Sequence, residues 1–302
     1  MAVEHTPVLL EQVLEAFAPL APGMRLCDAT LGDGGHTAAL LERCPRCEFV
    51  GIDADAAMVE RAGSRLASAS ALTIVHRWSD EAIGDYGAFD RILVDLGVSM
   101  VHMRSPERGF SLRDDGPLDM RLDTTSGPSA ADLIATLREQ ELADLIYRFG
   151  EERYSRRIAR VICEGPRPRT TAELADAVWR AYPVAQRRGR VHPATRTFQA
   201  IRIAVNRELE RAERIVVRAA AALTPGGRLA MISFHSLEDR IVKHGFRALA
   251  SEASSASQAG PMNTTGVDYV VRTKKPILPS EHEVRSNLAA RSAKLRVLER
   301  VT

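Results

Sequence analysis

Short apolar runs alternate with amphipathic segments in the first third of the chain. The apolar runs are rich in β-branched residues and lie at 24–28, 48–53, 72–76 and 89–95. Between them, residues 37–43 and 56–66 repeat apolar positions with a helical period. Short apolar strands that alternate with helices are typical of a parallel sheet covered on both faces. The pattern therefore predicts an α/β fold.

The middle of the chain has a different pattern. Residues 104–128 are rich in glycine, proline and charge without a clear period, so we expect a functional loop or a segment that wraps a surface. From residue 129 to about residue 222 the sequence looks helical, with helix starts indicated at Ser129 and Thr171. One long amphipathic pattern spans 195–223.

Strand patterns return in the last third. Residues 225–227 (PGG) predict a turn, and strands are expected at 228–234, at 268–272 and within 281–302. Residues 251–260 are low in complexity, and we expect them to be mobile. This order of patterns indicates one sheet domain, made of residues 1–105 and 211–302, that a helical insertion at 106–210 interrupts.

Charge is unevenly spread, although the formal net charge is only +2. Acidic residues outnumber basic ones in residues 1–100, and basic residues outnumber acidic ones in 137–220 and 270–302. A polyanion would therefore meet the later segments rather than the first. A solvated helical face with ion pairs four residues apart explains the same arginines equally well.

Composition excludes some classes of protein. With 45% hydrophobic and 26% charged residues the chain is not disordered throughout. No apolar run approaches the roughly 20 residues of a membrane span, and the N-terminus lacks the pattern of a signal peptide. The isolated pair Cys44 and Cys47 has no second pair to complete a zinc site. We expect reduced thiols in a cytoplasmic protein without a metal site, with metal binding as the minor alternative.

Candidate chemistry follows three of the predicted strands. A glycine-rich turn, residues 32–35 (GDGG), comes directly after the first strand, Asp53 ends the second and Asp95 ends the fourth. Ligands of open α/β sheets bind at the carboxyl ends of the strands. An acid about 20 residues after the glycine turn commonly accepts hydrogen bonds from ribose hydroxyls. A plain tight turn with two capping acids is the structural alternative.

The glycine spacing favours a nucleoside without phosphates. It lacks the regular GxGxxG pattern that holds a pyrophosphate at a helix N-terminus. S-adenosylmethionine fits better, because its ribose needs an acid, its ammonium group needs a carboxylate and its adenine needs an apolar wall. Trp78, just after the third strand, is a candidate for that wall.

Longer literal motifs run in order from one end of the chain to the other: 5–10 (HTPVLL), 28–36 (DATLGDGGH), 95–99 (DLGVS), 108–111 (RGFS), 116–121 (GPLDMR), 150–153 (GEER), 192–199 (HPATRTFQ), 233–240 (SFHSLEDR) and 291–296 (RSAKLR). They resemble the motifs of one known family, the RsmH (MraW) methyltransferases. The resemblance implies a class I (Rossmann-like) S-adenosylmethionine-dependent methyltransferase sheet with an inserted helical domain. It also implies N4-methylation of a cytidine in the decoding region of the small ribosomal subunit, cytosine 1402 of 16S rRNA.

The resemblance also implies which residues bind the cofactor. Carried over by position, they are Gly34, Gly35, His36, Asp53, Trp78, Asp95 and His102. Two of them depart from the family pattern: Trp78 stands where the family usually has Phe, and His102 stands where it usually has Gln. The tryptophan keeps a flat apolar wall, whereas the histidine changes reach and can titrate.

The implied substrate is small-subunit ribosomal RNA, within an assembled or nearly assembled subunit. RNA readers often stack unpaired bases on aromatic rings or arginine planes, which makes Phe110, Arg196 and Phe198 candidates, although Phe198 lies on the apolar stripe of its helix. His235 is a candidate for touching the target base and equally a structural histidine. No catalytic residue is assigned. We expect no membrane partner, and a homodimer stays open.

The acids and arginines of one helical motif invite two interpretations. Glu151, Glu152 and Arg153 are expected to form local ion pairs. With Arg156 and Arg157 close by, the same cluster is also able to position contacts with phosphates.

Two rival functions remain at this point. One is a nucleotide-binding oxidoreductase on a similar sheet, which the irregular glycine spacing disfavours. The other is a non-catalytic RNA-binding ribosome-assembly factor on a methyltransferase fold, which the acids at the expected strand ends disfavour.

Overall fold

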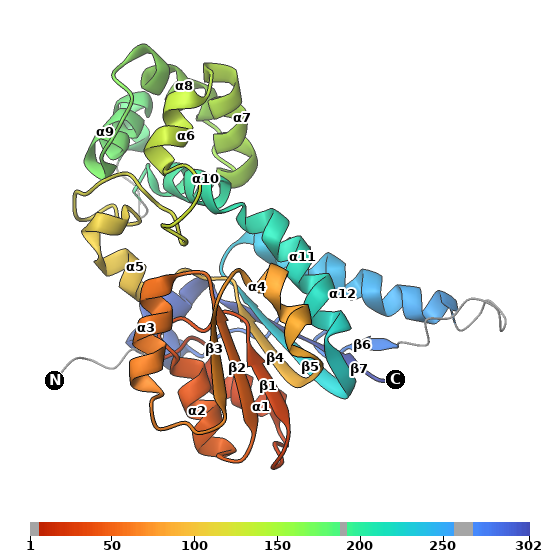
Figure 1. Ribbon diagram of the computed structural model, residues 1–302. Helices are drawn as coiled ribbons and strands as arrows, with labels where there is room; N and C mark the ends of the chain where they lie inside the picture. Colours follow the sequence, from red (N-terminus) through yellow and green to blue (C-terminus); the bar gives the residue numbers. More distant parts are fainter. Residues whose placement is uncertain (1–5, 188–191, 257–267) are drawn as a thin grey trace. The chain divides into compact units, whose positions relative to one another are not determined.

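The computed structural model describes residues 6–187, 192–256 and 268–302, with residues 252–256 described by their backbone alone. The chain divides into two compact units. The first joins Met1–Gly97 with Leu209–Thr302, and the second comprises Val98–Glu208 (Figure 1). The second unit therefore starts before residue 106, where the sequence placed the start of the insertion.

The first unit is built on a seven-stranded sheet with the order β3-β2-β1-β4-β5-β7-β6 (Figure 1). Its strands are β1 Arg25–Asp28, β2 Glu48–Asp53, β3 Leu72–His76, β4 Phe89–Asp95, β5 Leu223–Ser233, β6 Tyr269–Val271 and β7 Lys294–Arg300. Strands β1 to β5 pair in parallel, whereas β7 runs antiparallel to β5 and β6. The strand order reverses between β1 and β4, as in doubly wound sheets, and the predicted Rossmann-like α/β class is confirmed.

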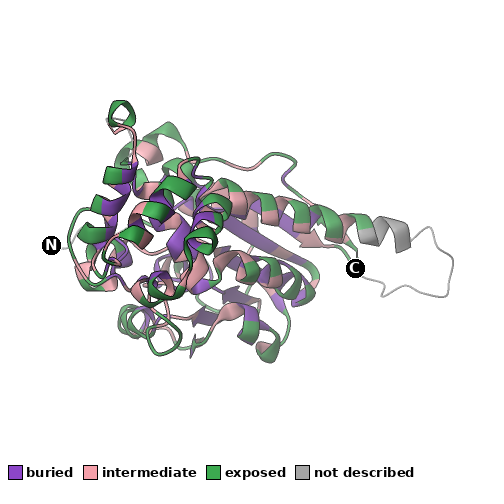
Figure 2. Cartoon of the chain, turned by 90° about the horizontal axis from the view of Figure 1, so that it is seen from above, coloured by how far each residue is buried: buried purple, intermediate pink, exposed green. Residues whose placement is uncertain are grey.

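Both faces of the sheet are buried under helices. Along β4, Ile92 and Val94 pack in one core cluster with Phe246, whereas Leu93 packs in another with Phe17. Successive side chains of a strand point to opposite faces, so this continuous apolar run serves two cores. In Figure 2 buried residues accordingly follow the strands, and exposed residues follow the outer sides of the helices.

Two helices of this unit, Gly35–Arg43 and Ala56–Arg65, match segments that the sequence predicts to be helical. The helices of the unit are α1 Leu10–Phe17, α2 Gly35–Arg43, α3 Ala56–Arg65, α4 Ser79–Ala82, α11 Glu208–Ala221, α12 Ser236–Ala256 and α13 Glu281–Ser286, with 3-10 turns η1 Ile83–Tyr86 and η4 Leu288–Ser292. In the described parts of the chain no helix is long and apolar enough to cross a bilayer.

Two expectations about the last third need correction. Strand β5 begins at Leu223, before the predicted turn at 225–227, and its register against β4 shifts at that point. The glycine turn is thus an irregularity within the strand: a Cβ on Gly227 would lie 2.7 Å from the carbonyl oxygen of Thr224. Of the segment 251–260, the first six residues continue α12, and the others lie outside the described residues.

The expectation of reduced thiols is wrong for one pair of cysteines. Cys44 and Cys47 form a disulfide, whereas Cys27 and Cys163 are free. The pair closes the end of α2, where Cys44 is the C-cap residue. Two cysteines three positions apart reach each other without any help from the rest of the fold, so the spacing alone did not decide between thiol and disulfide.

The second unit is helical. It contains α5 Met100–Arg104, α6 Ala130–Thr136, α7 Glu139–Gly150, α8 Ser155–Glu164, α9 Thr171–Ala181 and α10 Thr195–Asn206, with 3-10 turns η2 Pro106–Arg108 and η3 Val184–Gln186. The predicted starts are confirmed by capping boxes, in which Ser129 pairs with Asp132 and Thr170 pairs with Glu173. The cap of α9 is therefore one residue earlier than Thr171.

The long amphipathic pattern at 195–223 is two helices rather than one. Helix α10 ends at Asn206, and α11 begins at Glu208. Between them Arg207 adopts a left-handed conformation with φ 52°. Arginine rarely takes this conformation, so no residue in the pattern signals the break.

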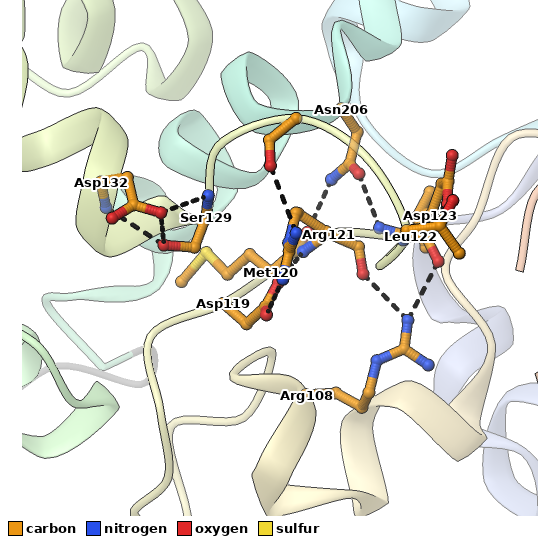
Figure 3. Close-up of polar contacts among 11 residues, drawn as sticks. Arg108, Asp119, Met120, Arg121, Leu122, Asp123, Ser129, Asp132 and Asn206 are labelled. Atoms are coloured by element: carbon orange, nitrogen blue, oxygen red, sulfur yellow. Dashed lines mark hydrogen bonds and ion pairs between the residues drawn. The ribbon is translucent and has the colours of Figure 1, made fainter.

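The segment 104–128, expected to be functional or to wrap a surface, contributes to the core of the second unit. Leu118 and Met120 are buried in the same cluster as the helices. Asn206 fixes the segment with two hydrogen bonds: its Nδ2 donates to the carbonyl of Met120 (2.8 Å), and its Oδ1 accepts from the amide of Leu122 (2.8 Å) (Figure 3). Arg108 donates to the carbonyls of residues 121 and 122 from the other side (Figure 3).

Candidate active site

Three aspartates end three neighbouring strands of the first unit. Asp28 ends β1, Asp53 ends β2 and Asp95 ends β4. These strands are adjacent and parallel, with β1 in the centre, so the three carboxyl ends meet at one edge of the sheet. The sequence singled out Asp53 and Asp95 and missed Asp28, although its place at the end of a predicted strand was the same signal.

Asp53 has a fixed carboxylate. Its Oδ2 accepts the amide of Gly32 (2.7 Å) and its Oδ1 accepts the amide of Asp55 (2.8 Å). Asp55 in turn caps α3 by accepting the amide of Ala57 (2.8 Å). A carboxylate oxygen accepts more than one hydrogen bond, so Asp53 keeps acceptor capacity for hydroxyl groups while its orientation is set by the backbone.

Asp95 and Asp28 are carboxylates in desolvated surroundings. Burial is the largest cause that raises the pKa of Asp95 to about 6, against a nearby His36 and an amide hydrogen bond from Gly97 (3.1 Å), both of which lower it. Burial likewise raises the pKa of Asp28 to about 6, although Thr37 donates a hydrogen bond to it (2.8 Å). This edge of the sheet is therefore a place where added positive charge is stabilised.

Contacts within the protein already require glycine at two positions of the glycine-rich turn. Gly34 has φ +81°, and a Cβ there would lie 2.8 Å from Leu66. A Cβ on Gly35 would lie 2.7 Å from Pro7. A Cβ on Gly32 would instead meet open space, with the carbonyl oxygen of Thr30 nearest to it at 4.0 Å. Packing alone thus explains glycine at positions 34 and 35, and their contact with a cofactor stays a prediction.

His36 and Trp78 come after the ends of β1 and β3, and they differ in how far they are buried. The ring of His36 is buried in the first turn of α2, and its Nε2 donates to the carbonyl of Val8 (3.0 Å). Trp78 follows β3 and precedes α4; the residue before it, Arg77, donates its amide to the carbonyl of Asp53 (2.9 Å). Trp78 is partly exposed, and it follows directly on the residue that is hydrogen bonded to Asp53.

The remaining cofactor candidate belongs to the second unit. His102 lies on α5 and is buried, with its ring 5.2 Å from that of Phe110. Phe110 itself is only 5% exposed, so its predicted role as a stacking platform for a base is wrong. Phe198 is buried at the same level, as its position on the apolar stripe indicated, whereas Arg196 is exposed.

Glu152 does not follow the prediction of local ion pairs among residues 151–153. This carboxylate is fully buried and accepts hydrogen bonds from the hydroxyl of Tyr182 (2.5 Å) and the amide of Tyr154 (2.8 Å). Arg153 lies over the ring of Tyr154 and donates to Gln186. Glu152 is thus part of the core, and the exposed arginines are separate from it.

His235 follows the end of β5 in the first unit. Its Nδ1 accepts the amide of Glu238 (3.3 Å), and its Nε2 lies 3.0 Å from the Glu238 carboxylate. The same carboxylate accepts the amide of Phe234 (2.7 Å). The histidine is therefore held by the start of α12, and its contact with a substrate base stays a prediction.

The profile of the MraW methylase family matches residues 2–301. The chain belongs to this family. The small-subunit ribosomal RNA methyltransferase H of Treponema denticola is 44% identical over 306 residues, which cover 98% of this chain and 97% of that protein. The protein of the same name from Synechococcus elongatus is 46% identical over 300 residues, covering 98% and 95%. A solved rRNA methylase from Streptococcus thermophilus has 10% identity and a TM-score of 0.43, covering 97% and 95%.

As a member of the MraW methylase family, the chain is a methyltransferase that uses S-adenosylmethionine, as the sequence predicted. The residues at the sheet edge fit this group. Asp53 offers oriented acceptors for hydroxyls, the desolvated Asp95 suits a cationic group, and Trp78 offers an aromatic surface.

Proposed function

We propose that this protein transfers the methyl group of S-adenosylmethionine to N4 of one cytidine in the decoding region of small-subunit ribosomal RNA, cytosine 1402 of 16S rRNA. The observation that carries the proposal is the meeting of Asp53 and Asp95 at one sheet edge in a member of the MraW methylase family. The names of its relatives, ribosomal RNA small subunit methyltransferase H, support the substrate class.

In this proposal three side chains hold the cofactor. Asp53 accepts hydrogen bonds from the ribose hydroxyls, Asp95 faces the ammonium group, and Trp78 covers the adenine. Gly34, Gly35 and His36 contribute the turn that follows β1, and His102 stays a further cofactor candidate by its position in the family motif. The bound cofactor supplies an electrophilic methyl group, and the protein fixes the direction from which that group is reached.

Catalysis then rests mainly on positioning. The N4 lone pair of cytosine is delocalised into the ring, so the amino group is a poor nucleophile and must be held in line with the methyl group. A hydrogen-bond acceptor that contacts the amino group would make its nitrogen a better nucleophile. A base must finally take the proton that this nitrogen loses. His235, held through Glu238, is our candidate for contact with the base.

The second unit is proposed to bind the RNA. Its helix α8 begins with exposed Arg156 and Arg157, next to exposed Arg153. Arginines of this kind pair with phosphates and release counterions, which makes binding strong at low salt. The substrate is proposed to be an assembled or nearly assembled small subunit, and the site of action is the cytoplasm, where these subunits form.

The test is mass spectrometry of modified nucleosides. Small subunits from cells that lack this enzyme are incubated with the protein and S-adenosylmethionine, and their RNA is digested to nucleosides. We expect N4-methylated cytidine to appear with the wild-type protein and not with Asp53→Ala. Methylation of another nucleoside would refute the N4 assignment. RNA binding without any methyl transfer would favour the non-catalytic assembly factor.

A further inference from the structure

One face of Trp78 is covered by a guanidinium group. The Cζ of Arg211, in the first turn of α11, lies 3.8 Å from the centroid of the Trp78 ring. This is stacking distance for a cation on an aromatic face. Because the ring as a whole is still partly exposed, the surface that Trp78 offers to a ligand is the part that Arg211 leaves uncovered.

Arg211 is itself fixed by acids of α4. Its Nη1 lies 2.7 Å from Oδ1 of Asp80 and 2.9 Å from the carboxylate of Glu81. Asp80 is only 2% exposed, so this pair is weakly screened by solvent. Trp78 is the N-cap residue of the same helix. One short segment thus carries both the ring and the acids that hold the arginine over it.

A second arginine provides the comparison. Arg214, one turn further along α11, binds the other oxygen of Asp80 with its Nε (2.7 Å). Arg218 donates to the backbone carbonyl of Asp80 (2.6 Å). These two contacts tie α4 to α11 without Arg211. The stack on Trp78 is therefore a feature that the joining of the two helices does not require.

We propose that Arg211 is a positioning residue for cofactor binding: held by Asp80 and Glu81, it fixes the ring of Trp78 as the wall for the adenine. The proposal rests on the cofactor site proposed above. A ring that is already held in place loses less conformational freedom when the ligand binds, and this raises affinity. Removal of the guanidinium frees the ring to change rotamer and lowers affinity, although Arg211 touches no cofactor atom in this account.

Calorimetry with S-adenosylmethionine on the full chain separates positioning from structure. We expect Arg211→Ala to raise the Kd by about fivefold to tenfold, because a Trp78 ring with freed rotamers must then be immobilised when the ligand binds. Arg211→Lys should show most of this loss, because an ammonium group cannot stack on the ring and bridge two carboxylates together. The matched control Arg214→Ala should stay within about twofold of wild type.

Fluorescence gives a readout that a purely structural role would not move. The chain has two tryptophans, so Trp179→Phe leaves Trp78 as the single tryptophan, which is excited selectively at the red edge of the absorption band. In this background Arg211→Ala should make Trp78 more accessible to acrylamide quenching, whereas Arg214→Ala should not. Thermal unfolding of each variant reports whether it folds, and Arg211→Lys supplies the test if Arg211→Ala does not.

The outcomes distinguish this proposal from the one on which it rests. Weaker binding by Trp78→Ala with wild-type affinity in both Arg211 variants keeps the adenine wall and overturns the positioning role. Equal losses in Arg211→Ala and Arg214→Ala also overturn it, because the cluster would then act only through the fold. Wild-type affinity in Trp78→Ala removes Trp78 from the cofactor site, and the role of Arg211 with it.

Discussion

The two units of this chain differ in the charged groups at their proposed binding sites. The sheet unit buries acids at the strand ends: Asp28 is 3% exposed, and burial raises the pKa of both Asp28 and Asp95 to about 6. The helical unit leaves arginines such as Arg156 and Arg157 in solvent. Desolvated carboxylates are stabilised most by a small cationic ligand that is held in place, whereas exposed arginines bind most favourably to a polyanion. The contrast suits one unit that binds the cofactor and another that binds nucleic acid.

The largest expected effect is on the sheet unit alone. Asp53→Ala should raise the Kd for S-adenosylmethionine by about 100-fold, because each lost hydrogen bond to a charged acceptor is worth about 1.5 kcal/mol. Asp53→Asn should lose less, since it keeps one acceptor oxygen for the turn. Calorimetry measures both.

The control for this change is Asp85→Ala, which removes an exposed acid paired with Arg77 in the same unit. It should leave the affinity unchanged. Wild-type affinity in Asp53→Ala, with an unchanged thermal transition, would mean that Asp53 does not bind the ribose.

The next effect is a pH dependence of cofactor affinity. A carboxyl group with a pKa of about 6 is nearly all ionised at pH 7.5 and about one-tenth ionised at pH 5. Only the ionised Asp95 attracts an ammonium group, so affinity should fall by about tenfold over this range as the pH is lowered. Asp95→Asn should bind weakly with a flat profile.

Asp28→Asn is the matched control for the titration, because Asp28 has a similarly raised pKa. It should keep the pH dependence of the wild type. If the pH dependence of affinity is lost in Asp28→Asn and kept in Asp95→Asn, the titrating group is Asp28 rather than Asp95, and our assignment is wrong.

A smaller effect should be confined to the helical unit. The double change Arg156→Gln and Arg157→Gln should weaken RNA binding by about fivefold at moderate salt and reduce the slope of log affinity against log salt by roughly one per lost phosphate contact. Cofactor affinity should not change. Filter binding over a salt series provides the measurement.

Arg138→Gln serves as the control here, because Arg138 is exposed but already pairs with Glu141. An unchanged salt slope in the double variant would remove α8 from the RNA surface. A change in cofactor affinity would show that the two units do not divide the labour as their charges suggest.

The last effect is on stability rather than on binding. The folded-state pKa of Asp28 lies above its ordinary value of 3.8, so ionisation destabilises the fold as the pH rises from about 4 to about 6. Asp28→Asn avoids this cost and should be more stable than wild type by up to about 3 kcal/mol at pH 7.5, with the difference vanishing near pH 4. Urea unfolding at both pH values checks it. A loss of stability at pH 7.5 would show that the hydrogen bond from Thr37 outweighs the desolvation of the carboxylate.

How far the sequence predicts this site depends on which forces assemble it. Asp53 and Asp95 were predictable because parallel strands bring their carboxyl ends together whatever the rest of the chain does. Arg211 was not, because its partner Asp80 lies 131 residues away and only the packing of α11 brings them together. Trp78 lies between these cases: its strand end was visible and its stacked partner was not.

The same limit explains the errors in the fold. Phe110 sits in a segment of glycine, proline and charge, so nothing local indicated that it is buried. Arg207 breaks a helical pattern through its backbone conformation rather than its residue type. The disulfide of Cys44 and Cys47 was missed because the spacing of the two cysteines allows both the thiol and the disulfide state. The cytoplasmic compartment, inferred from the sequence, then favoured the thiols. Periodicity predicts elements well, and it does not predict which tertiary contacts override local propensity.

The most direct test of the account is a crystal structure of this protein with S-adenosylhomocysteine. We predict both ribose hydroxyls within hydrogen-bonding distance of the Asp53 carboxylate, the ammonium group facing Asp95, and the adenine against the face of Trp78 that Arg211 leaves open. A ligand bound away from the ends of β1, β2 and β4, or a ribose held by other residues, would contradict it.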